Sequence, residues 1–165
     1  MMDPDFVTAL LQTVDDSASR MLSISDGQAA ARPAADKWSR KEILGHLIDS
    51  AANNQSRFVR AQLDGDFVFE GYDQDGWVRV QRYQDRSWAE LIRVWCAYNH
   101  QVAEIMRQAT TGELDRPRLR HNLTGVAFQP LPADATPTLD FLMRDYVVHI
   151  QHHLDQILDA KGDGR

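Results

Sequence analysis

The chain has 165 residues, of which 43% are hydrophobic and 25% are charged, and its formal net charge is −6. These values are typical of a globular protein, and we predict a single domain over residues 1–165. Lysine and arginine are scattered without the basic stripe that phosphates require, so we expect no nucleic-acid partner. No apolar run approaches the roughly 20 residues of a membrane span, and no signal-peptide pattern is visible, so we expect no membrane partner and a cytoplasmic location. Cys96 is the single cysteine, which excludes an internal disulfide and fits that location.

The first half of the chain predicts two long helices. The first begins at Asp3-Pro4 and carries apolar residues at three- and four-residue steps to Leu22. Asp26-Gly27 and a later proline interrupt this pattern and predict a connection. Ser39 and Glu42 then form a capping-box sequence, which predicts a helix from residue 39 to about residue 63.

Residues 65–86 are irregular and rich in aromatic side chains, and we expect them to form an ordered cover over one end of a bundle. The alternative is a long loop that packs for stability alone. Ser87 and Glu90 form a second capping-box sequence, which predicts a helix to about residue 108.

Residues 113–135 contain three prolines and predict a loop or a short strand pair. Thr136-Pro137 then predicts the start of a last helix that ends near Asp159. The four predicted helices each have one apolar stripe, so the expected fold is all-α: a four-helix bundle with two long connections.

The strongest chemical signal lies in the last predicted helix, where three histidines fall within five residues. His149 and His153 are four residues apart, so they share one helix face and can bind one metal ion. A helical wheel places this pair at the edge of the buried face and His152 facing outward. His46 has the same kind of edge position on the 39–63 helix and completes a set of three ligands if the two helices pack together. The alternative is that these are ordinary polar residues at a core boundary.

Other polar residues are weaker candidates. Asp49 and Asn53 follow His46 by one and two helical turns and could orient a ligand imidazole or a bound water, or simply face solvent. His100 is interpreted as structural or exposed. His121 is a candidate for the mouth of the site, and the aspartates of the aromatic segment are candidates for substrate contact, namely Asp73 and Asp75.

Two segments carry a resemblance to a known family. They read Lys37-Trp38-Ser39-Arg40-Lys41-Glu42-Ile43-Leu44-Gly45-His46-Leu47 and Asp145-Tyr146-Val147-Val148-His149-Ile150-Gln151-His152-His153-Leu154-Asp155-Gln156-Ile157, with Gly71-Tyr72-Asp73 between them. With these segments the chain resembles the DinB/YfiT-like family of metalloenzymes over nearly its whole length. The resemblance implies a four-helix bundle, often a homodimer, with a divalent metal, zinc or nickel. It also implies three histidine ligands, which carry over to His46, His149 and His153.

Such a centre would activate water or a thiol, so the expected function is that of a metal-dependent hydrolase or a thiol S-transferase acting on a small-molecule substrate. The resemblance allows both reactions, because relatives include hydrolases and transferases of low-molecular-weight thiols. Arg57 is a candidate partner for the carboxylates of a thiol cosubstrate. The alternative function is a non-catalytic, stress-linked module for metal binding and dimerisation.

Overall fold

Four long helices form the bundle that the sequence predicts. The computed structural model describes residues 1–132 and 134–158, and this part of the chain is helical without a strand. The long helices are α1 (Pro4–Met21), α3 (Arg40–Leu63), α5 (Trp88–Gln108) and α7 (Leu139–Leu158). None of the described helices combines the length and the apolar character that crossing a bilayer requires.

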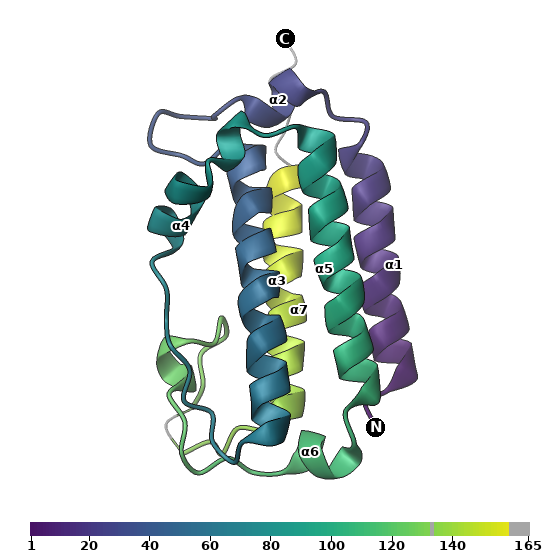
Figure 1. The fold of residues 1–165 in the computed structure, drawn as a ribbon, viewed down its shortest axis with the longest axis vertical. Coiled ribbons are helices and arrows are strands. Elements are labelled where there is room, and N and C mark those ends of the chain that lie inside the picture. Colours follow the sequence, from purple (N-terminus) through teal and green to yellow (C-terminus); the bar gives the residue numbers. More distant parts are fainter. Residues whose placement is uncertain (133, 159–165) are drawn as a thin grey trace.

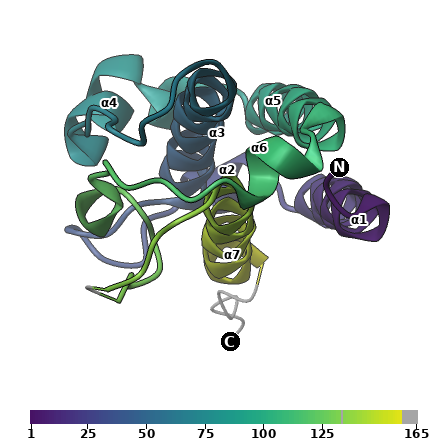
Figure 2. The same cartoon turned by 90° about the horizontal axis from the view of Figure 1, so that it is seen from below.

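The order of the helices in space differs from their order in the sequence. α5 packs between α1 and α3, and α7 closes the ring by packing on both α3 and α1. α1 and α7 run in one direction and α3 and α5 in the other (Figure 1). The connection from α3 to α5 therefore travels back along the length of the bundle. Seen along the helices, most of both long connections lies on the side of α3 and α7 that faces away from α1, whereas the short helix α6 (Thr111–Asp115) crosses the end of the bundle (Figure 2).

The predicted starts of α1 and α3 are confirmed. The Asp3 side chain accepts a hydrogen bond from the backbone N–H of Asp5, and Pro4 occupies the first helical position. At α3, the Ser39 hydroxyl accepts from the Glu42 N–H, and the Glu42 carboxylate accepts from the Ser39 N–H. Each of these caps is local in sequence, so the sequence pattern was sufficient to identify it.

The second predicted capping box is wrong, although α5 does begin at Trp88. The Ser87 side chain makes no capping hydrogen bond. The Trp88 N–H instead donates to Asp26 Oδ1 at 2.9 Å, and the Glu90 carboxylate pairs with Arg86 at 2.6 Å. A residue 62 positions earlier therefore supplies the cap of this helix.

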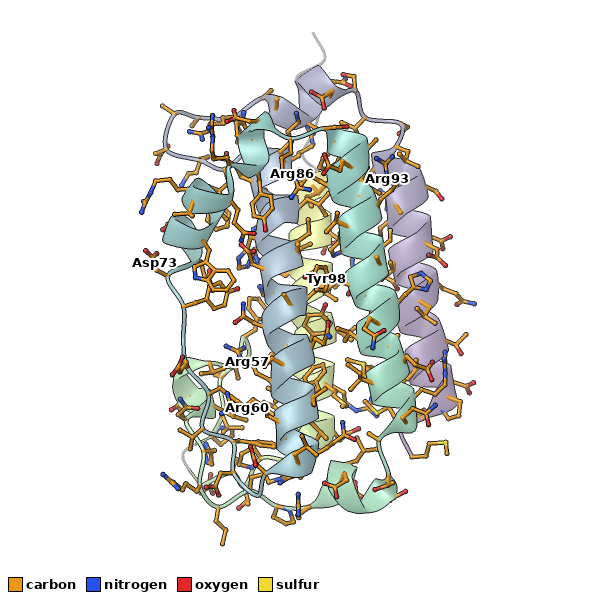
Figure 3. All side chains as sticks on the ribbon, in the orientation of Figure 1. Arg57, Arg60, Asp73, Arg86, Arg93 and Tyr98 are labelled. Carbon is orange, nitrogen blue, oxygen red and sulfur yellow. The ribbon has the colours of Figure 1, made fainter. Side chains whose placement is uncertain are left out.

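The connections contain short helices that the sequence interpretation missed. They are α2 (Asp26–Ala30), α4 (Gln74–Gln81) and α6 (Thr111–Asp115), with 3₁₀ turns η1 (Tyr83–Asp85) and η2 (Leu123–Gly125). Each short α-helix has its own side-chain cap, from Ser25, Asp73 and Thr110 respectively. Asp73, a candidate for substrate contact, accepts from the Gly76 N–H at the start of α4 (Figure 3).

The last helix begins later than predicted. Thr138 Oγ1 accepts from the Phe141 N–H at 3.2 Å, so α7 begins at Leu139 and not at Thr136-Pro137. Its predicted end near Asp159 lies outside the described residues.

The two long connections are joined to each other. Phe67 and His121 form an isolated parallel bridge, and the Asn122 side chain exchanges hydrogen bonds with the backbone of Phe69 at 2.7 and 3.0 Å. This single bridge replaces the short strand pair considered for residues 113–135. The joined connections cover the side of the bundle along α3 and α7, whereas the sequence predicted that residues 65–86 would cover one end of it (Figures 1 and 2).

One interpretation of α3 is wrong. The sequence allows Asp49 to face solvent on the polar side of this helix, but Asp49 is 2% exposed, and Glu42 at the start of the helix is 6% exposed. Tyr83, from η1, packs on this side and donates a hydrogen bond from its hydroxyl to Asp49 Oδ1 at 2.6 Å. α3 is therefore buried on nearly all sides around residues 44–51.

The hydrogen bonds of Asp26 make the stability of the fold depend on pH. Its carboxylate accepts from Lys41 Nζ at 2.8 Å and from the Trp88 N–H, and these two bonds, Lys41 first, lower the pKa of Asp26 below the ordinary 3.8. A depressed carboxyl pKa stabilises the fold above the unfolded pKa, and this contribution is lost as pH falls through the folded pKa. Asp26→Asn should therefore lower Tm at pH 7, and the difference from the wild type should shrink below about pH 4. Thermal unfolding by circular dichroism checks this, with Asp36→Asn as the control, and a difference that is constant with pH would contradict it.

Candidate metal centre

Three histidines from two helices converge between α3 and α7. His46 lies on α3, and His149 and His153 lie one turn apart on α7. One ring nitrogen of each residue lies within 4.8 Å of the other two. The ring centroids are 4.6–5.1 Å apart, and each pair of rings meets edge to face. The packing of α3 on α7 therefore brings together residues that are about a hundred positions apart in the sequence.

The nitrogen geometry fits a shared metal ion. His46 Nε2 and His149 Nε2 are 3.1 Å apart. Two imidazole nitrogens at 2.0–2.1 Å from one ion with tetrahedral angles would lie about 3.3 Å apart. The His153 Nδ1–H donates to Gln156 Oε1 at 2.8 Å, and His149 Nδ1 lies 3.3 Å from Ser50 Oγ. These contacts use the Nδ1 atoms of His153 and His149 and leave their Nε2 atoms available to bind an ion.

The site favours neutral imidazoles. Burial, together with the neighbouring His153, lowers the pKa of His46 to about 4. Burial and the three surrounding histidines lower the pKa of His149 to about 3. Burial also lowers the pKa of His153. Neutral imidazole is the form that binds metal ions, so no proton has to be removed at neutral pH before an ion can bind.

The three histidines line a cavity of about 380 Å³ that also extends between α3 and the long connections. This volume is typical of sites for small molecules. On one side the Phe128 ring packs against His149, with ring centroids 5.2 Å apart. The loop that carries Phe128 is fixed by Asp145, whose carboxylate accepts from the backbone N–H groups of Phe128 and Gln129 at 2.8 and 2.7 Å.

The remaining histidines lie outside the group of three. His152 is exposed, as the helical wheel predicts, although its ring also reaches the cavity and packs on Phe128. His100 is exposed and pairs with Asp15 on α1 at 3.0 Å. His121 lies in the bridge between the connections and not in the cavity lining.

Asp49 and Asn53, the two candidates for orienting a ligand, lie near the site and make no hydrogen bond to its histidines. Asp49 Oδ1 accepts from Tyr83 and Gln81, and Asn53 Nδ2 donates to the Asp49 backbone carbonyl at 2.8 Å. Asp49 Oδ2 and His46 Nδ1 are both buried and, among the described residues, have no hydrogen-bond partner. A role for Asp49 or Asn53 in orienting a ligand stays a prediction.

Several residues of the site were not identified from the sequence. Trp38 packs its ring on His46 at 5.4 Å, and Ser50, Gln156, Phe128 and Asp145 make the contacts described above. Ser50 and Asp145 each lie one helical turn from a histidine, which is a signal that could have identified them. Phe128 lies in a loop, and only the folded structure shows its position.

The fold and site define a four-helix bundle with three histidines gathered at a cavity between two helices. A family model described as the DinB superfamily matches residues 9–157, so the chain belongs to the DinB superfamily. A solved structure, YfiT from Bacillus subtilis, is similar with a TM-score of 0.71 and 15% sequence identity, over 96% of this chain and 87% of that one. YfiT is described as a probable metal-dependent hydrolase with an unusual four-helix bundle topology. No curated protein sequence matches significantly.

Proposed function

We propose that the protein is a metal-dependent enzyme in which His46, His149 and His153 hold one divalent ion, zinc or nickel. The observation that carries this proposal is the convergence of three ring nitrogens within 4.8 Å at the wall of a cavity. The bound ion would lower the pKa of a water or a thiol and polarise an electrophile. The description of YfiT as a probable metal-dependent hydrolase supports the proposal.

The residues of the chain have separate roles in this proposal. The three imidazoles hold the ion, while Gln156 and Ser50 orient two of the rings through their Nδ1 atoms. Phe128 and Tyr72 line the cavity and reduce the access of bulk water to a bound molecule. Asp145 holds the Phe128 loop in place through two backbone hydrogen bonds.

The alternative is a non-catalytic module that binds a metal and dimerises. A structural metal site is expected to have four protein ligands, whereas a catalytic site keeps an open position. Among the described residues, the group of histidine, cysteine and carboxylate side chains that converge contains three members and no fourth. The cavity beside these three residues supports the catalytic proposal. The homodimer and the cytoplasmic location stay predictions.

An assay of the metal-loaded protein tests the proposal and separates its two reactions. The protein would be incubated with activated esters and with alkyl halides, each with and without a small thiol. Metal-dependent turnover without thiol would identify a hydrolase, and turnover only with thiol would identify a transferase. The His149→Ala variant should lose either activity. Absence of metal-dependent turnover under all of these conditions would contradict the enzyme proposal and favour the non-catalytic alternative.

A further inference from the structure

A cationic side chain lines the same cavity as the three histidines. Arg57 lies on α3, eleven positions after His46, which is a net rotation of about 20° and places both residues on one helix face. Figure 3 shows Arg57 on the side of α3 that faces the long connections. The cavity is lined by His46 at one end and also by Arg57, with Ser50 and Asn54 between them on α3.

The hydrogen-bonding capacity of Arg57 is largely unused. A guanidinium has five N–H donors. Among the described residues it makes one hydrogen bond, a long one from Nη2 to the Glu70 carbonyl at 3.5 Å, and the charge also lies 5.9 Å from the centroid of the Phe69 ring. Within the described part of the chain, no carboxylate lies within ion-pair distance of Arg57. Partial burial lowers the pKa of this guanidinium, and the nearby Tyr72 and Asp145 act in the opposite direction without forming an ion pair with it.

The other charges around the cavity indicate which ligand fits. Asp145 also lines the cavity, but each of its carboxylate oxygens already accepts a backbone N–H. Its charge would repel a dianion more strongly than a monoanion, and one guanidinium balances one negative charge. A planar carboxylate matches the two parallel donors of a guanidinium. These features favour a carboxylate over a phosphate.

We propose that Arg57 binds the carboxylate of the small molecule on which the metal centre acts. This inference rests on the proposed function, because the metal position defines where the reactive end of that molecule lies. The Cα atoms of His46 and Arg57 are about 16 Å apart along the helix axis. Side chains lean toward the N-terminus of a helix, so the Arg57 guanidinium lies closer to the histidines than its Cα atom does. A ligand that contacts both ends is therefore extended, with its carboxylate several bonds away from the reactive group.

Binding to the cobalt-loaded protein tests this proposal. Thiolate binding to cobalt gives a charge-transfer absorption band, so mercapto acids can be compared with mercapto alcohols of equal chain length. We expect 6-mercaptohexanoate to bind at least about tenfold more tightly than 6-mercaptohexanol. Arg57→Gln should remove this preference without changing the affinity for the alcohol, and Arg57→Lys should retain part of it. Arg60→Gln is the matched control, because Arg60 lies one turn further along the same helix and does not line this cavity.

A measurement on the metal-free protein tests the role of Arg57 independently of the proposed metal site. The Arg57 side-chain Nε–H resonance, assigned by its loss in Arg57→Lys, should shift with hexanoate and stay unchanged with hexanol. Failure of the wild type to bind cobalt would contradict the proposed function alone, since the metal-free measurement still tests Arg57. Equal affinities of the acid and the alcohol, or no shift with hexanoate, would overturn the carboxylate proposal. Tighter binding of inorganic phosphate than of hexanoate would overturn it as well.

Discussion

Replacing His149 with alanine is expected to abolish metal binding in purified protein. Its Nε2 lies 3.1 Å from His46 Nε2, and its ring contacts both other histidines, so its loss leaves two ligands. Losing even an outer partner of a ligand costs 10–100-fold in affinity, so losing a ligand should cost more than about 100-fold. Metal analysis after dialysis, together with competition against a chromogenic chelator, measures this effect. His46→Ala and His153→Ala should behave in the same way.

Two other histidines provide matched controls. His152→Ala should retain the metal, because His152 is exposed and is not among the three converging residues. His100→Ala should also retain it, since His100 pairs with Asp15 on the far helix α1. Circular dichroism would establish that every variant is folded. Unchanged metal content in all three ligand variants would show that the site is assigned wrongly, as would loss of the metal in His152→Ala alone.

Gly45→Ala is expected to be the most destabilising of the conservative substitutions in α3. A Cβ atom at this position would lie 2.1 Å from Tyr83 Cδ2 and 2.2 Å from Tyr83 Cγ. The ring cannot easily move away, because it is buried and its hydroxyl donates to Asp49 at 2.6 Å. Overpacking of this kind costs about 3 kcal/mol, and alanine gains about 1 kcal/mol in helix propensity, so the net loss should be about 2 kcal/mol. Tm should fall by roughly 4–8 °C in thermal unfolding.

Two further variants test whether the clash with Tyr83 causes this loss of stability. Gly27 lies in α2, and a Cβ atom there meets nothing within 4 Å, so Gly27→Ala should leave stability unchanged or slightly increased. In a Tyr83→Ala background, Gly45→Ala should no longer destabilise the protein, because the clashing ring is absent. If Gly45→Ala lowers stability equally in that background, the clash with Tyr83 is not the reason for the loss.

The sequence predicts those parts of the fold that depend on local interactions. Ser39 and Glu42 cap α3 through residues three positions apart, and periodic apolar residues mark all four long helices. The prediction fails at Ser87 because Asp26, far away in sequence, satisfies the first N–H of α5. The expectation that Asp49 could face solvent fails for the same reason, since Tyr83 and Gln81 cover Asp49 from the following connection. Sequence periodicity alone cannot identify such a cover.

For the candidate site too, the sequence predicts what depends on local geometry and misses what depends on packing. The His149 and His153 pair follows from helix geometry, because residues four apart lie on one face. The addition of His46 depends on the packing of α3 against α7. Its edge position on the helix made it a candidate, and the resemblance to the family supported that choice, but neither shows that the two helices bring the three residues together. The Phe128 loop and its anchoring by Asp145 depend on how a long connection folds back over α7. No local pattern in the sequence contains this information.

X-ray absorption spectroscopy of the zinc-loaded protein tests the central claim most directly. We expect three imidazole nitrogens at about 2.0–2.1 Å and a further oxygen ligand from solvent. Addition of a small thiol should replace that oxygen with sulfur at about 2.3 Å. A spectrum with four protein ligands that does not change with thiol, or with fewer than three imidazoles, would contradict an open three-histidine centre.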